Sequence, residues 1–322
     1  MFNRGFLALA SMTALAGSVA AADLGRKAPA PAAPAASTAC RESAGLPSDA
    51  FGFTAGTDVA DLNSWGGGLE YSGSYGTRFG SLQAHGLKAQ VSTSPVRCLE
   101  IGPSLTYNWG QTSERIGLTS ARSTAVGGGL EFKYKLFGRG ENGFGLTFVT
   151  EPTLAHGRSR FSDPLTPAYT RGDGAIAGNT AKILLDVELV KDKLYGAFNI
   201  EHVASFTRDG VNGCTTAGGN GYCKGSNLNL RAALSLKVAD GLFLGVDAAH
   251  QRAYTGTFLN TNPGHAWFAG PNIFWQVNEK VSLNAAWSTQ LAGKANGQIA
   301  GQKLNLDDFS RHIAKVKLGV AF

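Results

Sequence analysis

The sequence lacks a long hydrophobic run: no uninterrupted apolar stretch reaches the roughly 18 residues that a membrane-spanning helix needs. Charged residues are scarce, at 16% of 322 residues, and the net charge of +6 is not gathered into one basic stripe. These features argue against spanning helices and against a nucleic-acid-binding protein. Mean hydropathy is nevertheless close to zero, at −0.06, as expected when apolar residues alternate with polar ones in a large barrel.

Catalytic and ligand-binding motifs are also missing. There is no G-x-S-x-G motif and no His, Cys, Asp or Glu cluster with metal-ligand spacing. His202 and Ser205 lie close in sequence but fall on opposite faces of a strand, so the spacing does not bring a nucleophile to its base. Three glycines, residues 127–129, lie inside a strand pattern with no helix after them, unlike a phosphate-binding loop. We therefore expect no enzyme activity, cofactor or metal.

What the chain does contain is alternation, and its last stretch, residues 311–322 (RHIAKVKLGVAF), shows it best. One face carries Val316, Leu318 and Phe322, while the other carries Lys315 and Lys317. A period of two predicts a strand, because successive side chains point to opposite sides. An apolar face for lipid, a polar face for a lumen and a terminal aromatic residue are typical of the closing strand of an outer-membrane barrel.

The same pattern recurs along the chain and predicts a transmembrane antiparallel β-barrel of about twelve strands. The predicted strands are residues 65–75, 82–92, 99–109, 124–137, 144–154, 180–190, 194–206, 228–238, 242–253, 266–277, 281–291 and 311–322. Residues 51–59 (FGFTAGTDV) also alternate, but counting them gives an odd number, which is disfavoured in single-chain bacterial barrels. We interpret residues 51–63 as an N-terminal extension near the rim or inside the lumen. The alternative is about fourteen strands, one of them unrecognised.

The segments before the barrel have their own compositions. Residues 1–22 resemble a secretory signal peptide, with a basic start, an apolar core and small residues at the end. Residues 23–50 are rich in Pro and Ala and predict a disordered periplasmic tether. The barrel itself would occupy residues 64–322.

The stretch ADLGRKAPAP, residues 22–31, together with the terminal aromatic strand, resembles porin-like outer-membrane β-barrel proteins of rhizobia and related alphaproteobacteria. The resemblance implies the bacterial outer membrane as the location and says nothing about cargo. The chain is longer than the small members of that group. It also lacks the cysteine-bracketed N-terminal signature of the general porins from these bacteria.

Predicted connections alternate in length, and this predicts the orientation. Short links lie near residues 94–97, 138–143, 191–193, 239–241 and 278–280, and long ones at residues 111–123, 155–179, 208–227, 254–265 and 292–311. Outer-membrane barrels keep short turns on the periplasmic side. Because the last strand follows a long loop, we predict that both termini are periplasmic.

The four cysteines allow three sets of two disulfides. Cys214 and Cys223 share one long loop, whereas Cys40 lies in the tether and Cys98 at a short turn. The two ends of the barrel face opposite sides of the membrane, so we predict the pairs Cys214–Cys223 and Cys40–Cys98. Unpaired thiols are the alternative.

Charged residues at inward positions are the candidate lumen lining, and both signs are represented. They are Glu131, Lys133, Lys135, Lys182, Asp186, Glu188, Glu201, Arg231, Lys237, Lys315 and Lys317, with Glu70, Lys88, Glu100, Glu151 and Asp247 at further inward positions. Five lysines fall toward the short-turn ends of their strands: Lys133, Lys135, Lys237, Lys315 and Lys317. They predict either a basic ring that favours anions or ordinary lumen charges.

The sequence thus predicts a passive channel for small polar solutes, surrounded by outer-membrane lipid. The alternative is a structural or surface-interaction barrel without an open pore. Formation of a homo-oligomer is left open, and no nucleic-acid partner is expected. Outward aromatic residues are predicted to form interfacial girdles: Tyr71, Tyr75, Tyr107, Trp109, Trp275 and Trp287.

Overall fold

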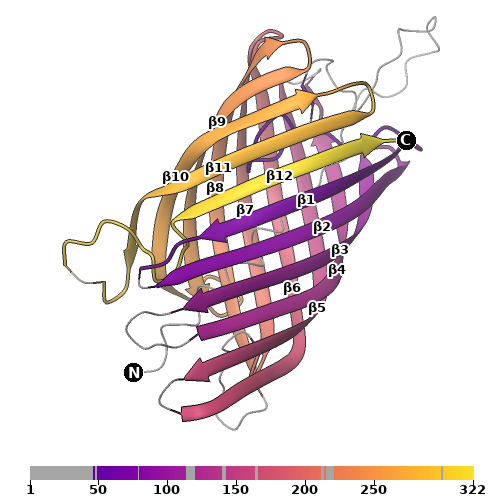
Figure 1. The fold of residues 1–322 in the computed structure, drawn as a ribbon. Helices are drawn as coiled ribbons and strands as arrows, with labels where there is room; N and C mark the ends of the chain where they lie inside the picture. The colour runs from indigo at the N-terminus through magenta and orange to yellow at the C-terminus, as the bar shows by residue number, and fades with distance from the viewer. Residues whose placement is uncertain are drawn as a thin grey trace, which may run out of the picture.

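Strict alternation along the chain produces twelve strands, each paired antiparallel with its neighbours in sequence (Figure 1). They are β1 (Trp65–Tyr75), β2 (Ser81–Val96), β3 (Leu99–Ser113), β4 (Ser120–Phe137), β5 (Phe144–Asp163), β6 (Thr166–Val190), β7 (Leu194–Arg208), β8 (Tyr222–Ala239), β9 (Leu242–Thr255), β10 (Thr261–Gln276), β11 (Val281–Ala295) and β12 (His312–Ala321). The computed structural model describes residues 46–47, 49–78, 80–113, 120–139, 143–163, 166–211, 214, 221–298 and 300–322.

The sheet closes on itself where β1 pairs with β12. The register there sets Glu70 opposite Lys317 and Ser72 opposite Lys315. Closure leaves no free strand edge, which is the condition for a sheet to cross a membrane. The predicted twelve-stranded barrel is confirmed, and residues 51–59 add no strand to it. Within the described residues, no helix has the length and apolar character needed to cross a membrane.

Most strands extend past their predicted bounds, and β5 and β6 do so the furthest. Residues 155–163 and 166–179 were expected to form a long loop, but they continue β5 and β6, with Gly157 opposite Gly174 and Arg160 opposite Arg171. That expectation was wrong because the apolar side of the alternation stops near Leu154, whereas backbone pairing does not require an apolar face. β5 and β6 therefore extend well past the 9–11 residues that cross a bilayer.

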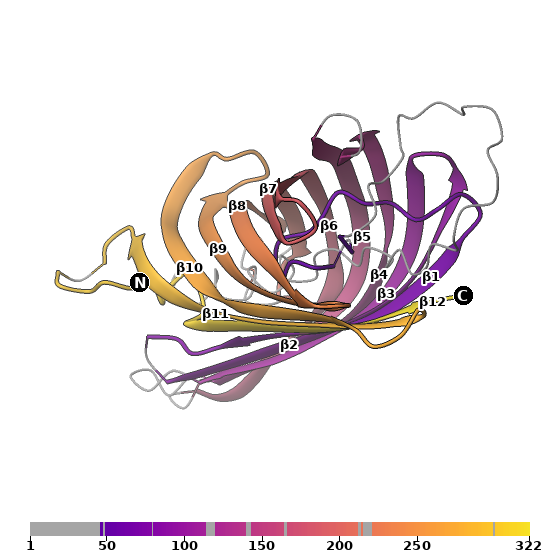
Figure 2. The same cartoon turned by 90° about the horizontal axis from the view of Figure 1, so that it is seen from above.

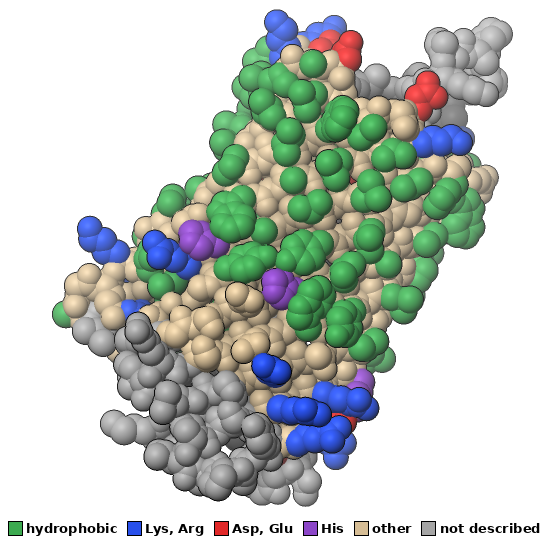
Figure 3. Space-filling view, in the orientation of Figure 1, with side chains coloured by type: hydrophobic (Ala, Val, Ile, Leu, Met, Phe, Trp, Pro, Cys, Tyr) green, Lys and Arg blue, Asp and Glu red, His purple; other side chains and the backbone are tan. Residues whose placement is uncertain are grey.

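The two faces of the sheet differ in chemistry. Large apolar side chains point outward, with Leu105 73% and Leu154 71% exposed, and they cover the side of the barrel in Figure 3. Such exposure suits contact with lipid. On this face Tyr75 stacks on Trp287 with ring centroids 6.0 Å apart, and Trp109 stacks on His85 at 5.0 Å. The inward face carries buried charged and amide side chains.

Candidate functional site

An N-terminal stretch of the chain lies inside the barrel. It comprises residues 46–47 and 49–61, here called the lumen segment, and Figure 2 shows it within the ring of strands. Phe51 and Asp58 are 1% exposed and Thr57 is fully buried. The segment begins before the predicted boundary at residue 51, because Leu46 and Asp49 already belong to the buried set.

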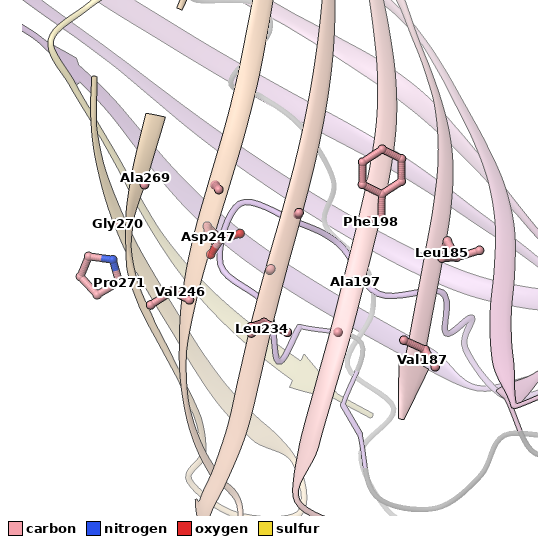
Figure 4. A pocket seen from close by; sticks show the side chains of 14 residues that line it. Leu185, Val187, Ala197, Phe198, Leu234, Val246, Asp247, Ala269, Gly270 and Pro271 are labelled. Atoms are coloured by element: carbon pink, nitrogen blue, oxygen red, sulfur yellow. The ribbon is translucent and has the colours of Figure 1, made fainter. Parts of the chain in front are cut away.

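Two wall carboxylates hold the backbone of the lumen segment. Asp247 of β9 accepts hydrogen bonds from the backbone N–H groups of Gly52 at 3.2 Å and Thr54 at 3.0 Å, and Figure 4 shows its carboxylate pointing toward the segment. Asp186 of β6 accepts one from the N–H of Thr57 at 2.8 Å and another from the Thr57 hydroxyl at 2.9 Å. The segment has no strand ladder of its own, so these carboxylates satisfy donors that burial would otherwise leave unpaired.

The acidic side chains of the lumen segment bind basic groups of the wall. Asp49 lies 2.6 Å from the Lys317 ammonium of β12. Asp58 lies 3.1 Å from Lys135 of β4 and 2.6 Å from Arg139. All these side chains are buried or nearly so. Because an isolated buried charge is costly, segment and wall neutralise each other.

Arg139 joins the segment to a second part of the wall. It follows the end of β4 and donates to Asp58 through Nη2 and to Asp186 through Nη1, at 2.6 and 2.7 Å. Its Nη2 also approaches the Leu46 carbonyl oxygen at 3.4 Å. One guanidinium thus links both arms of the lumen segment to β6.

The lumen segment enters and leaves at the same end of the barrel, the end of the short turns, here called the short-turn end. At entry, Leu46 packs in an apolar cluster with Tyr195, Phe243 and Phe274, near the short-turn ends of β7, β9 and β10. At exit, the backbone N–H of Asn63 bonds the Ser94 carbonyl oxygen at 2.8 Å. The stretch between makes its contacts deeper in the lumen.

The apex of the segment is an aromatic side chain between two cations. The Phe53 ring lies 5.9 Å from the Arg231 guanidinium and 5.9 Å from the Lys315 ammonium. It also packs against an apolar cluster that contains Phe268 and Ile313. A cation over an aromatic face is attracted by the ring quadrupole, so Phe53 partly compensates two wall charges.

Wall side chains also bond one another, in a set here called the wall belt: Glu201 lies directly opposite Lys182 and Asn229 on neighbouring strands, whereas Lys88 of β2 reaches Glu151 of β5. Lys88 pairs with Glu151 at 2.5 Å and Lys182 with Glu201 at 3.3 Å. Other polar contacts in the wall belt are Gln90 to Glu131 at 3.2 Å and Asn229 to Glu201 at 2.7 Å. A small cavity of about 50 Å³ remains beside this belt, bordered by Thr106, Thr153 and Thr180 among others. That volume holds only one or two water molecules.

The structure distributes the predicted lumen residues over three environments. Lys133, Lys135, Asp186, Lys315 and Lys317 contact the lumen segment. Glu131, Lys182, Glu201 and Arg231 lie in the wall belt, and Arg231 also contacts Phe53 of the lumen segment. The remaining two lie at turns: Glu188 accepts from the Asp192 backbone N–H, and Lys237 pairs with the exposed Asp240 at 2.9 Å.

The long-loop end has a closure of its own. Residues 300–311, between β11 and β12, fold back onto the barrel, where Asn305 bonds the Lys294 carbonyl oxygen at 3.1 Å and Asp308 at 2.7 Å. Phe309 packs with Phe268, with ring centroids 6.4 Å apart. Burial raises the pKa of Asp308, and the Asn305 hydrogen bond opposes that shift.

The disulfide Cys214–Cys223 is present in the loop between β7 and β8, with Cα atoms 5.7 Å apart. Cys98, at the turn between β2 and β3, is also disulfide-bonded. Its predicted partner Cys40 lies outside the described residues, as do the predicted signal peptide and most of the tether. In the part of the chain that the structure describes, no group of acidic, His or Cys residues could hold a metal ion.

A groove of about 660 Å³ lies on the outward side of β6–β10. Figure 4 shows Phe198 and Pro271 at its border, away from the lumen segment. Small outward residues such as Gly196, Ala232 and Ala248 create the depression. Its lining is almost wholly apolar, so it suits lipid chains and lies apart from the lumen.

Sequence reasoning missed Asp49, Asp58 and Arg139 as functional residues. The sequence offered one indication of this site. Residues 51–59 alternate like a strand, but counting them gives an odd number of strands, so they had to lie outside the sheet and find their polar partners inside the barrel. No local pattern pointed to Arg139, which follows β4 next to a short turn.

Residues 47–322 match a family described as "Family of unknown function (DUF6662)". No curated protein matches the chain. Among solved structures, the chain resembles the translocator domain of the autotransporter NalP from Neisseria meningitidis, with 12% identity, a TM-score of 0.53, and coverage of 81% of this chain and 89% of that one. It also resembles the COG4313 outer membrane channel from Pseudomonas putida F1, with 12% identity, a TM-score of 0.52, and coverage of 81% and 96%. At such identities the likeness shows the fold alone, which is that of Gram-negative outer-membrane barrels.

Replacing Asp58 with Asn should loosen the lumen segment. The change leaves Lys135 and Arg139 with a buried positive charge that is no longer fully compensated, which costs about 3–5 kcal/mol when one partner of a buried ion pair is removed. Amide hydrogen exchange at Thr57 and Ala60 should become faster, because their N–H groups are protected by bonds to Asp186 and Glu100.

The matched control for that change is Asp192→Asn. Asp192 is exposed in the turn between β6 and β7 and has a positive φ of 57°, which Asn tolerates. This control should leave exchange in the lumen segment unchanged. Equal exchange rates in the Asp58→Asn protein and the unaltered protein would show that the ion pairs of Asp58 do not hold the lumen segment in place.

The fold of residues 300–311 should depend on pH through Asp308. A raised pKa in the folded loop means that the packed loop gains stability below the pKa of a free Asp side chain, about 3.9. That contribution is lost as pH rises through the raised pKa. Protection factors of loop amides should therefore fall between acidic and neutral pH, and Asp308→Asn should flatten the profile. An equally steep profile in the variant would exclude Asp308 as the cause.

Proposed function

The chain belongs to DUF6662, a family of unknown function, and we propose that it is an outer-membrane channel for small polar solutes whose lumen is closed by its own N-terminal segment. The observation that carries the proposal is the chemistry of the contacts between the lumen segment and the barrel wall. Wall carboxylates and cations of five strands (β3, β4, β6, β9 and β12) bind the segment. A permanently closed barrel could fill the same space with its own side chains.

The lumen segment is suited to release from the wall because most of its contacts with the wall are polar. When the segment leaves, Asp186, Asp247 and Lys317 exchange protein hydrogen bonds for water, a change with a small net free energy per bond. The main apolar surfaces uncovered are those of Phe51 and Phe53. The polar wall that remains would suit water and small hydrophilic solutes rather than apolar ones.

We propose the orientation from the lengths of the connections. Short turns of such barrels face the periplasm, and on this proposal the entry of the lumen segment, Phe322 and Cys98 would lie on that side. The segment would then respond to events in the periplasm, while residues 300–311 pack on the barrel at the opposite end.

One observation favours the second candidate, a structural barrel with no open pore. Lys88, Glu151, Lys182 and Glu201 are buried, and they form ion pairs with one another without a carboxylate or cation from the lumen segment. Wall side chains that pair in this way can fill a narrow lumen. The two candidates differ in whether removal of the segment produces a conducting path.

Planar-bilayer conductance separates the two. The full chain should give rare, brief openings, and a protein without residues 46–61 should give frequent or lasting discrete steps. The double variant Asp49→Asn/Asp58→Asn keeps the segment but removes its two carboxylates, and it should give intermediate opening because Lys317, Lys135 and Arg139 lose their partners.

The control is Asp192→Asn/Asp240→Asn, which removes two carboxylates from short turns, and it should behave like the full chain. Folding of each protein is checked by its thermal unfolding transition. If correctly folded protein without residues 46–61 gives no steps, the lumen is closed by its own wall and the structural barrel is the better description.

The open channel should prefer anions weakly. Without the segment, Lys133, Lys135 and Lys317 lose their contacts with it and face the lumen near one end. Asp186 and Asp247 lose theirs as well and limit the preference. The reversal potential in a salt gradient should shift toward cations in the variant Lys133→Gln/Lys135→Gln/Lys317→Gln. An unchanged reversal potential would remove the basic ring as the origin of selectivity.

A further inference from the structure

Three arginines lie directly opposite one another on neighbouring strands near the long-loop end. Arg122 of β4 pairs in register with Arg160 of β5, and Arg160 pairs with Arg171 of β6. All three side chains are exposed and occupy outward positions of the alternation. Like charges directly opposite each other destabilise a sheet, so this arginine row costs stability unless an anion bridges it.

The described part of the protein supplies no such anion. No carboxylate among the described side chains forms an ion pair with Arg122, Arg160 or Arg171. The nearby carboxylate of Asp173 lies opposite Arg158 in the register and is already used, at 3.2 Å from the Arg158 Nε and 2.5 Å from the His156 Nε2. The row is therefore a set of guanidinium groups available to an external ligand.

The position of the row indicates where that ligand comes from. Along the outward face of β5, Arg160 is six residues past Leu154, which is 71% exposed and belongs to the apolar band. Six residues span roughly 20 Å of strand, or about 15 Å along the barrel axis at the usual strand tilt. The headgroup layer of a bilayer is only about 5–8 Å thick on each side, so the row stands about 7–10 Å beyond its outer limit, at the level of groups that a large headgroup carries outward. Arginine side chains can reach back several ångströms toward it.

We propose that the arginine row binds phosphate groups carried on the sugar headgroup of a glycolipid in the leaflet at the long-loop end. Guanidinium groups bind phosphate oxygens bidentately, and an array of them suits a polyanion better than a single charge. A sugar headgroup places its phosphates farther from the acyl chains than a simple glycerophospholipid does. The acyl chains of the same molecule would contact Val126 and Leu154, on the two strands that carry Arg122 and Arg160.

The two ends of the barrel differ in a way that supports this assignment. At the short-turn end, exposed charges of both signs alternate, as in Lys191, Asp192 and Lys193. Figure 3 shows basic side chains gathered at the lower right, toward the long-loop end, with little acidic colour among them, whereas both signs occur together at the top. A one-sided excess of basic groups beside the apolar band matches an anionic leaflet on that side.

Binding of a purified glycolipid tests the proposal. Full-chain protein in a zwitterionic detergent is titrated with a bisphosphorylated diglucosamine glycolipid and with the same lipid after removal of its phosphates. The unaltered protein should bind the phosphorylated form at least about tenfold more tightly, a difference of about 1.4 kcal/mol. The variant Arg122→Gln/Arg160→Gln/Arg171→Gln should lose that difference.

The matched control, Lys191→Gln/Lys193→Gln/Lys280→Gln, removes three exposed positive charges from the opposite end and should bind like the unaltered protein. Equal weakening of both variants, or equal binding of the two lipid forms, would overturn the proposal. Pyrophosphate or phosphatidylglycerol binding as tightly as the glycolipid would overturn the choice of ligand.

Thermal unfolding in the absence of lipid gives a second, independent test of the arginine-row proposal. If the row is a binding surface, its triple Gln variant should unfold at the same temperature as the unaltered protein or higher, since mutual repulsion is removed. A lower unfolding temperature than that of the control variant would show that the row has a structural role and would overturn the proposal. The outcome of this test does not depend on whether the barrel is a channel.

Discussion

A charge that points into a closed barrel must find a partner inside it, and most of this structure follows from that requirement. The alternation that exposes apolar side chains to lipid sends Lys135, Asp186, Asp247 and Lys317 into the lumen with equal regularity. A ring of about twelve strands is too wide for every opposed pair to meet. Some wall side chains do meet, as Lys88 and Glu151 do at 2.5 Å. Nearer the short-turn end, the lumen segment supplies the missing partners, which explains why a short stretch without regular structure is so deeply buried.

The sequence predicted well whatever depends on neighbouring residues. Apolar and polar residues alternate along each strand, so the number of strands and the closing pair could be predicted. The order of short and long connections also allowed the pairing of Cys214 with Cys223 to be predicted. The extensions of β5 and β6 could not, because beyond Leu154 the backbone ladder continues without an apolar face. The contacts between the lumen segment and the wall could not be predicted from the sequence either. Asp49 and Lys317 are separated by 268 residues, and the alternation of residues 51–59 is the same whether its partner is another strand or a lumen wall. Only the odd strand count indicated that this stretch was different.

The two ends of the lumen are closed by different chemistry. At the short-turn end the closure is ionic, through Asp49 and Asp58. At the long-loop end it combines the amide of Asn305 with the aromatic contact between Phe309 and Phe268. The ion pairs of Asp49 and Asp58 are buried, so added salt screens them little. In the proposed channel, an open path would require the contacts at both ends to be released.

Entry and exit of the lumen segment at one end have a topological consequence. Within the described residues, the segment enters and leaves at one end and does not run the length of the lumen. Because the segment adds no strand to the sheet, the proposed channel could release it while β1 stays paired with β12. A covalent anchor near its base, such as a disulfide at Cys98, would restrict how far the loop travels but would not prevent the movement. Closure of the wall and binding of the lumen segment thus depend on separate contacts of one polypeptide, the first on backbone pairing and the second on wall side chains.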